Sequence, residues 1–456
     1  MSALILLAVL AAPPPLTLQE ATDIALERAN DMVQAREDLV LVDTEYLEAL
    51  SAVLPRVDLE MSAGGVFAGR RILESRNPVP AQLPTEFPQV NFGPFRDAQT
   101  NNYSHPNISL GLTVRQVLFD GGRSWTALEQ VDDSRDARTS ALEHISRLVR
   151  SRVAMAFYEL EKANQQVQAQ QAQLAMDEQQ VQRAQGLIKA GRGGRADLAT
   201  ARRNLARDQI QMRTARSTVA TAQRQFNLEL GRSVVEPVQL VLPEHVRTTT
   251  AAVAGPFVPA FDKLCDLARA RHPNLRSLRA ELERTDKAVQ FAVGDYWPVV
   301  ALQGSYRRSS RRPDRVFANP FTNYLATFDL VVQWNLFAGL SSKAQVQRAL
   351  VAQKKAQAEY DNSERLVFSE IAAVHERLAA QKEIVALAAQ EMQAAVEAVR
   401  LARGLYQGGR GTALELRSAE LGQTQARLSA VNARLEIEIA LAQLQQAVGV
   451  DDFAAP

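Results

Sequence analysis

Side chains that could catalyse a reaction or bind a metal are few in this sequence. Cys265 is the only cysteine, which excludes an intrachain disulfide and a cysteine-rich metal site, and its helical surroundings favour a buried structural thiol. The five histidines are scattered, without the spacing of metal ligands. The glycines at 191, 193 and 194 have neither the spacing nor the preceding strand of a phosphate-binding loop. The sequence therefore predicts no enzyme, no metal site and no cofactor.

The charge balance excludes a second class of function. The 52 basic and 51 acidic residues give a net charge of +1, so no electrostatic attraction to nucleic acid is expected. Hydrophobic residues make up 46% of the chain, whereas aromatic residues make up only 6%. This composition, rich in Ala, Gln, Leu, Arg and Glu, is typical of long helices rather than of a β-sandwich.

The chain contains an internal duplication. Residues 109–231 align without a gap on residues 327–449, at an offset of 218 positions. Within this stretch, the 16-residue windows that begin at Arg183 and Leu401 share seven identities. The earlier segments align at an offset of 243, because the first half carries a 25-residue insertion between residues 60 and 108. The predicted organisation is a signal peptide over 1–12, a first repeat over 13–231, a linker over 232–261, a second repeat over 262–449 and a tail over 450–456.

Each repeat is predicted to contain a very long helical hairpin. Apolar and small residues recur with heptad spacing over 149–188 and 367–406, which indicates a close-packed left-handed coiled coil. Each long helix would span roughly 100 Å and end at a glycine cluster, around Gly191 or Gly409, that permits a tight turn into a shorter return helix. The expected long helices are about Arg123–Lys189 and Ser341–Gln407, and the expected opening helices of the repeats are about Leu18–Leu54 and Phe261–Trp297.

Between the opening helix and the long helix of each repeat, the apolar period changes from 3.5 to 2. Two segments in each repeat alternate in this way, and each is roughly 10 residues long, as transmembrane β-strands are. A soluble, half-buried hairpin has the same alternation. Four strands are too few to close a barrel, and an open sheet edge cannot lie in lipid, so a membrane barrel would require several chains. The aromatic residues that cluster where strands meet helices, as in an interfacial girdle, are Phe119, Trp125, Trp297, Trp334 and Phe337.

The N-terminus carries a short apolar run over Leu4–Ala12. Val9 and Ala11 form a small-x-small pattern, which predicts a signal peptide, although basic residues are missing at its start. The run is therefore either a short signal peptide or a remnant of one. No other unbroken apolar stretch approaches 18 residues, so no transmembrane helix is expected.

With this order of elements, the chain resembles the TolC-like outer-membrane channel family over nearly its whole length after residue 16. Two local motifs support the resemblance: the segment Val117–Arg123, echoed at Asn335–Gly339, and the turn Tyr406–Gly409 followed by Leu414–Leu416. The resemblance implies a mainly α fold with a membrane β-barrel portion. Three chains would form an α-barrel from their duplicated helical hairpins, and the four strands of each chain would contribute to a shared twelve-stranded transmembrane β-barrel.

The resemblance also implies a function and its partners. Such proteins are trimeric exit ducts in the outer membrane, with a long periplasmic extension, that export small molecules or polypeptides. A homotrimer in outer-membrane lipid is therefore expected, serving a multidrug efflux pump or a type I secretion system. Its partners would be a periplasmic adaptor, also called a membrane fusion protein, and an inner-membrane transporter. The alternative, favoured by the heptads alone, is a periplasmic coiled-coil adaptor or scaffold without a pore.

The resemblance assigns roles to residues at the hairpin turns. Tyr406 falls on the gating tyrosine, Glu415 on the first of two acidic pore positions, and Ser418 on the second, where it departs from the family pattern. Asp197 matches Glu415 in the first repeat, so three chains would carry carboxylate rings that attract cations. Both acids also begin a predicted helix, where the helix dipole favours negative charge. The turn residues expected to contact the adaptor are Gly191, Arg192, Gly193, Gly409, Arg410 and Gly411.

Overall fold

The structure, a computed structural model, describes residues 15–68, 103–191, 193–247, 258–310 and 312–450. The predicted signal peptide, most of the insertion in the first repeat and Arg192 lie outside the described residues. The chain divides into two units, each of which takes segments from both repeats. The helical unit comprises Met1–Thr44, Gln130–Asp286 and Leu350–Pro456, and the sheet unit comprises Glu45–Glu129 and Lys287–Ala349.

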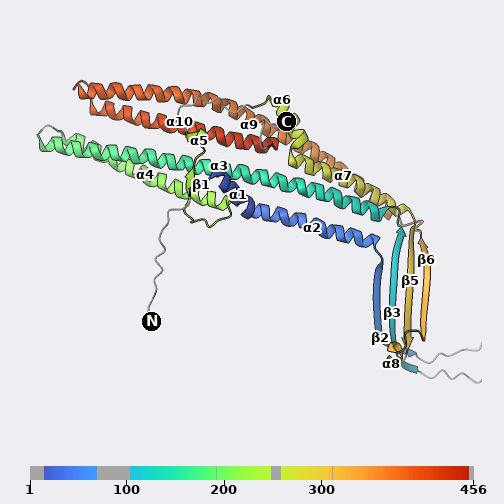
Figure 1. The fold of residues 1–456 in the computed structure, drawn as a ribbon. Coiled ribbons are helices and arrows are strands. Elements are labelled where there is room, and N and C mark those ends of the chain that lie inside the picture. The colour runs from blue at the N-terminus through green and yellow to red at the C-terminus, as the bar shows by residue number, and fades with distance from the viewer. Residues whose placement is uncertain (1–14, 69–102, 192, 248–257, 311, 451–456) are drawn as a thin grey trace, which may run out of the picture. The chain divides into compact units, whose positions relative to one another are not determined.

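Two long hairpins dominate the helical unit, and in Figure 1 they run alongside each other. The long helices α3 (Arg123–Lys189) and α9 (Ser341–Gln407) each have 67 residues, and both confirm the predicted ends. The return helices α4 (Arg195–Glu229) and α10 (Ala413–Val448) have 35 and 36 residues. Several heptad positions are fully buried, among them Val153 of α3 and Ile371 of α9, whereas positions nearer the turns, such as Leu174, are only partly buried.

Three pairs of glycines adopt left-handed backbone conformations at equivalent places in the two repeats. Each pair is separated by the 218-residue offset of the duplication. Because a side chain strongly disfavours this conformation, the paired glycines fix equivalent turns at the start of the long helix, at the hairpin turn and at the end of the return helix. The pairs and their φ angles are Gly121 and Gly339 (73° and 61°), Gly191 and Gly409 (72° and 68°), and Gly231 and Gly449 (64° and 77°).

The opening helices differ from the prediction, which was wrong in treating each as continuous. Both are broken, at Ala29 and at His272, which lie at the same position of the two repeats. Pro273 explains the second break, because the residue before a proline is driven to extended backbone. Ala29 precedes no proline, yet it has the same extended conformation. The resulting helices are α1 (Leu18–Arg28), α2 (Asn30–Val53), α6 (Phe261–Arg271) and α7 (Pro273–Val293).

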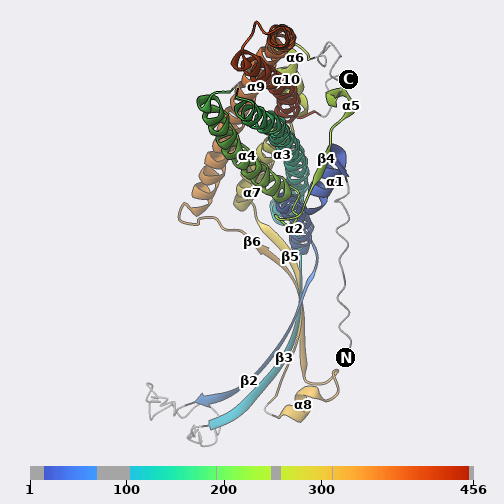
Figure 2. The same cartoon turned by 90° about the vertical axis from the view of Figure 1, so that its left-hand side faces the viewer.

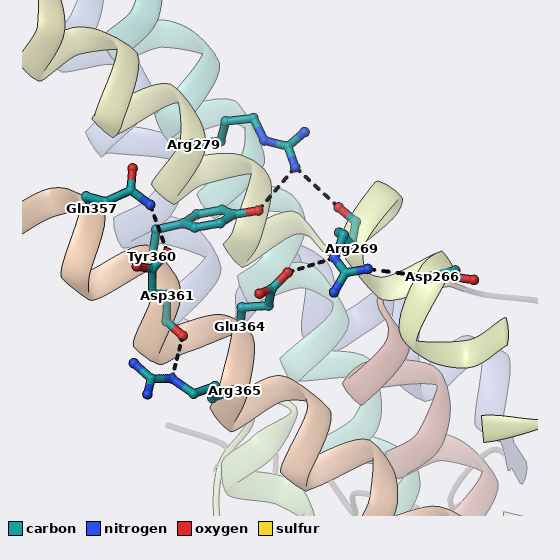
Figure 3. A network of polar contacts seen from close by, with 8 residues as sticks. All are labelled: Asp266, Arg269, Arg279, Gln357, Tyr360, Asp361, Glu364 and Arg365. Atoms are coloured by element: carbon teal, nitrogen blue, oxygen red, sulfur yellow. Dashed lines mark hydrogen bonds and ion pairs between the residues drawn. The ribbon is translucent and has the colours of Figure 1, made fainter. Parts of the chain in front are cut away.

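Equivalent arginines bridge the two breaks. Arg36 donates from Nη2 to the carbonyl oxygen of Leu26 at 2.9 Å. In the second repeat Arg279 donates to the carbonyl of Arg269 at 3.5 Å and to the Tyr360 hydroxyl at 3.2 Å (Figure 3). At each break, carbonyl groups at the end of the first helix have no intrahelical hydrogen-bond donor. The arginine supplies one.

Polar contacts also tie the second opening helices to α9, as Figure 3 shows. Arg269 donates from Nε to Glu364 Oε1 at 2.8 Å, and its guanidinium lies 5.1 Å from the centre of the Phe368 ring. The Glu364 carboxylate raises the pKa of Arg269 above its ordinary value. Because Arg269 is half-exposed, solvent screens this pair, and it contributes more to the alignment of α6 on α9 than to stability.

Two hydrophobic clusters form the core of the helical unit. The first includes Phe157 of α3 and Phe226 of α4, both fully buried, with ring centres 6.0 Å apart. The second includes Ile371 of α9 together with residues of α6 and α7. Helix α10 takes part in both, because Leu435 belongs to the first cluster and Ile437 to the second. The apolar residues of α10 thus join the two repeats into one unit.

The sheet unit contains four antiparallel strands in the order β2-β3-β5-β6. Leu59 pairs with Leu112, and Leu302 pairs with Leu330, so both hairpins have the same register. The strands run side by side in both views and twist along their length (Figure 2). No described helix is long and apolar enough to cross a membrane. The elements that lie wholly within this unit are β2 (Arg56–Ala68), β3 (Tyr103–Phe119), a 3-10 turn (Gly294–Tyr296), β5 (Val299–Ser310), α8 (Pro313–Phe317) and β6 (Tyr324–Gln333).

The segment between the repeats, predicted over 232–261 as a linker, carries secondary structure that its prolines did not suggest. It contains β4 (Gln239–Val241) and the short helix α5 (Glu244–Arg247). Strand β4 pairs in parallel with β1 (Pro15–Thr17), which directly precedes α1. The start of this segment is thereby held against the start of the first repeat.

Candidate functional site

The turn of the second hairpin places Glu415 at the start of α10. Thr412 caps this helix: the Glu415 amide donates to Thr412 Oγ1 at 3.2 Å, and the Thr412 amide donates to Glu415 Oε2 at 2.8 Å. This reciprocal arrangement is a capping box, which satisfies two amide groups at the helix end. Glu415 therefore has a structural role in the turn, and its side chain is also exposed.

The turn of the first hairpin lacks such a cap. Gly194 occupies the cap position of α4 without a side-chain hydrogen bond, and Asp197 lies exposed in the first turn of that helix. Gly193 is required for close packing, because a Cβ atom there would lie 2.9 Å from the backbone nitrogen of Ile188. Equivalently, a Cβ at Gly411 would lie 3.1 Å from the Tyr406 nitrogen. The carboxylate of Asp197 is thus less restrained than that of Glu415.

A cavity of about 250 Å³ lies between the two hairpins near their turns and brings some of the predicted residues together. Asp197 of the first hairpin and Tyr406 of the second both line it. Its other walls include Arg183, Leu187, Leu416 and Glu420. The exposed residues Glu415, Ser418 and Arg410 do not line this cavity.

A buried ionic cluster that the sequence does not predict lies next to residues that line this cavity. Arg417 of α10 contacts Asp177 of α3 at 2.9 Å and Asp208 of α4 at 3.5 Å, in both cases through Nη2. The arginine side chain is 8% exposed and both aspartate side chains are 1% exposed. One guanidinium thus joins the second hairpin to both helices of the first.

The sequence contains signals for part of the buried cluster and for the helix cap. Asp177 occupies an apolar heptad position, which marks a charge that must find a buried partner. The spacing of Thr412 and Glu415 is the sequence signature of a capping box. Nothing in the sequence indicates that Arg417 is the partner of Asp177, because the register between two separate hairpins has no local signal. Among the described residues, no group of three or more His, Cys, Asp or Glu side chains is arranged to hold a metal ion.

The apolar faces of the sheet are strongly exposed. On β2, Val57, Leu59 and Met61 are 61–71% exposed, and on β6 Phe328 and Leu330 are 75% and 63% exposed. The sheet order leaves β2 and β6 paired on one side only within the part of the chain that is described. Open strand edges and an exposed apolar face of this kind mark surfaces that pair with another chain or contact a membrane.

The five predicted interface aromatics belong to the sheet unit and are exposed. Phe119 ends β3, Trp297 precedes β5 and Trp334 follows β6, so these three lie at the same end of the sheet. Trp334 donates from Nε1 to the carbonyl oxygen of Tyr296 at 3.1 Å, which fixes its ring. The exposed fractions of Phe119, Trp125, Trp297, Trp334 and Phe337 range from 45% to 81%.

Proteins of known structure share this architecture, although a search of curated protein sequences found no match. Solved structures with the same fold include CusC, with a TM-score of 0.76 and 17% identity over 95% of this chain and 92% of that chain. The CmeC outer membrane channel of Campylobacter jejuni matches with a TM-score of 0.76 and 16% identity over 95% and 85% of the two chains. The open state of the MtrE outer membrane channel of Neisseria gonorrhoeae has a TM-score of 0.73 and 20% identity over 95% and 89%.

These structural likenesses, all below 25% identity, show the fold. The family is shown by the sequence itself, since the family model for outer membrane efflux proteins matches residues 21–232 and 264–450, which include both long hairpins and all four strands of the sheet. The chain therefore belongs to the outer membrane efflux protein family.

Proposed function

We propose that three copies of this chain form an exit duct through the outer membrane. As a member of its family, the chain lies in the outer membrane with a periplasmic extension. The proposed trimer would serve a tripartite efflux pump or a type I secretion system. A periplasmic adaptor and an inner-membrane transporter would deliver the cargo, which passes through a tunnel lined by the long helices.

The observation that carries this proposal is the four-stranded sheet with two open edges. In lipid every backbone donor and acceptor needs a partner within the protein, so the β2 edge of one chain must pair with the β6 edge of another. The exposed apolar side chains of β2 and β6 then face lipid. The exposed aromatics at the end of the sheet would lie at the membrane interface.

The hairpin turns are proposed to form the periplasmic gate. Tyr406 and Asp197 share one cavity, which supports a role for both in the contact between hairpins. Glu415 and Ser418 are exposed near the same turn and would face the pore in the trimer. The glycine turns, with Arg192 and Arg410, would contact the adaptor.

Ion selectivity in planar lipid bilayers tests the gate assignment. Carboxylate rings attract cations, so the double variant Asp197→Ala and Glu415→Ala is expected to lower the preference for cations over anions. The variant Asp197→Asn with Glu415→Gln keeps the shape of the side chains and should give the same change. A reversal potential that stays unaltered in both variants would remove these residues from the gate.

A further inference from the structure

The buried cluster of Asp177, Asp208 and Arg417 contains more acid than base. Helix α3 contributes Asp177 to the cluster, and Asp177 Oδ1 accepts a hydrogen bond from Gln173 Nε2 at 3.4 Å. Helix α4 contributes Asp208, whose Oδ1 lies 3.2 Å from Arg207 Nε. Helix α10 contributes Arg417. The Arg207 side chain is 56% exposed, so its charge is largely screened by solvent. One buried guanidinium therefore faces two buried carboxylates.

The charged groups that line the neighbouring cavity do not correct this imbalance. Arg183, Asp197 and Glu420 line the neighbouring cavity, where two acids face one base. Glu420 is further paired with Arg403 of α9 at 3.2 Å, within the second hairpin. The cluster at Arg417 thus has no further buried cation among these contacts.

The hydrogen bonding of the cluster is incomplete, and a proton would supply the bond that one of its carboxylate oxygens lacks. Asp208 Oδ2 is buried and receives no hydrogen bond, although it faces the same Arg417 nitrogen as Asp177 Oδ2. Two adjacent carboxylates in a buried site do not readily both stay ionised. A proton on one of them would let it donate to the other and would leave one net negative charge opposite Arg417.

We propose that Asp177 and Asp208 share one bound proton, and that this proton strengthens the contact between the two helical hairpins. Burial, followed by the hydrogen bond to Asp208, raises the pKa of Asp177 from 3.8 to about 6, against the opposing attraction of Arg417. Because this pKa is raised in the folded protein, folding gains stability as the pH falls through about 6 and loses it as the pH rises.

The same linkage applies to the docking of one hairpin on the other. Separation of α10 from α3 and α4 would remove both the burial of the two acids and the attraction of Arg417. Burial is the larger of these two influences on the proton, so the docked state binds the proton more tightly. By reciprocity, the bound proton favours the docked state. The hairpins of the proposed duct should therefore hold together in acid and loosen above neutral pH.

The experiment compares full-length wild-type protein in detergent with Asp177→Asn between pH 5 and pH 8. The amide imitates a permanently protonated Asp177, so it should remove the pH dependence that this group contributes. The unfolding rate of wild type relative to Asp177→Asn, measured at a fixed elevated temperature, is expected to fall by up to about tenfold from pH 8 to pH 5. Infrared spectroscopy should detect a protonated carboxyl band in wild type at pH 5 that is weaker in the variant.

Two further variants make the test specific. Arg417→Met removes the guanidinium but keeps an unbranched side chain that can fill the apolar part of the site, and it should shift the titration of the infrared band to higher pH. Glu420→Gln alters an acid whose pair lies within one hairpin, and its pH profile should parallel that of wild type. Parallel profiles for wild type and Asp177→Asn, a relative stability that rises with pH, or an unshifted band in Arg417→Met would each overturn the proposal.

Channel conductance provides the functional readout, which rests on the proposed function. Wild-type conductance should increase from pH 5 to pH 8, whereas Asp177→Asn should stay at the lower value throughout. A protein that forms no channel at any pH would contradict the proposed function, while the stability and infrared measurements would still decide whether the proton is bound. A channel whose conductance falls with rising pH would contradict the proton-strengthened contact alone.

Discussion

Replacement of Gly449 by alanine tests how the return helix fixes the break in the opening helix. Gly449 has a φ angle of 77°, and a Cβ atom there would lie 2.8 Å from both His272 Cα and Pro273 Cδ. The left-handed conformation costs an L-residue about 1 to 2 kcal/mol. Forcing a methyl group against two neighbouring atoms adds about 1 to 3 kcal/mol. The lower entropy of unfolded alanine offsets about 0.4 to 1 kcal/mol of this. Together these contributions predict that Gly449→Ala destabilises the helical unit by about 1 to 5 kcal/mol, with a central value of about 3 kcal/mol.

Gly409→Ala is the matched control. Its φ angle is 68°, but a Cβ atom at Gly409 would meet no atom within 4 Å. Only the conformational cost remains, so the loss should be about 1 kcal/mol. Gly231→Ala should behave like Gly449→Ala, because its Cβ would lie 2.7 Å from the carbonyl oxygen of Arg28.

The assay is the unfolding rate of the purified protein in detergent at a fixed elevated temperature, followed by the helical circular dichroism signal. A rate is preferred to a midpoint because large proteins often unfold irreversibly. Gly449→Ala and Gly231→Ala should unfold clearly faster than Gly409→Ala. Equal rates for the three variants would refute the reasoning, since they would show that the contact at the helix break contributes nothing beyond the backbone conformation.

Two more predictions concern acid stability and helix capping. Burial, with the nearby charges of His144 and Arg147, lowers the pKa of His272 to about 4, so the folded state resists a proton that the unfolded state binds near pH 6.5. Relative to His272→Gln, the wild-type protein should therefore lose stability as the pH falls from 6.5 toward 4, by up to about 3 kcal/mol. Because protonation of Asp177 stabilises the fold over the same pH range, the test is the difference between the two proteins, and a difference that does not change with pH would contradict the burial of a neutral ring. Thr412→Ala removes one half of the capping box and should destabilise the start of α10 by about 1 kcal/mol. Amide hydrogen exchange in the first turn of α10 should therefore become faster. Unchanged exchange there would count against the cap.

The long elements of this fold could be predicted from the sequence because their signals are local and repeated. The ends of α3 and α9 follow from heptads that stop at glycines. The broken opening helices could not be predicted in the same way. The break at Ala29 lies where Gly231, from the end of α4, packs against the Arg28 carbonyl, a contact between residues far apart in the sequence.

In the candidate site, too, local features could be predicted from the sequence, whereas contacts between distant residues could not. The carboxylates at 197 and 415 stand in the first turns of their helices, where local sequence predicts an acid, and the capping partner of Glu415 could have been recognised by its spacing. The link between Arg417 and Asp177 depends on how one hairpin is aligned along another. That alignment is set by packing over many residues, with no signal at either position.

Electron microscopy of the purified protein in a lipid nanodisc tests the central claim most directly, because it reveals both the number of chains and the pairing of the sheet edges. Three chains are predicted, with β2 of each chain paired to β6 of its neighbour in one closed twelve-stranded barrel that continues into a helical tunnel. A monomer, or an assembly whose β2 and β6 edges remain unpaired, would contradict the account.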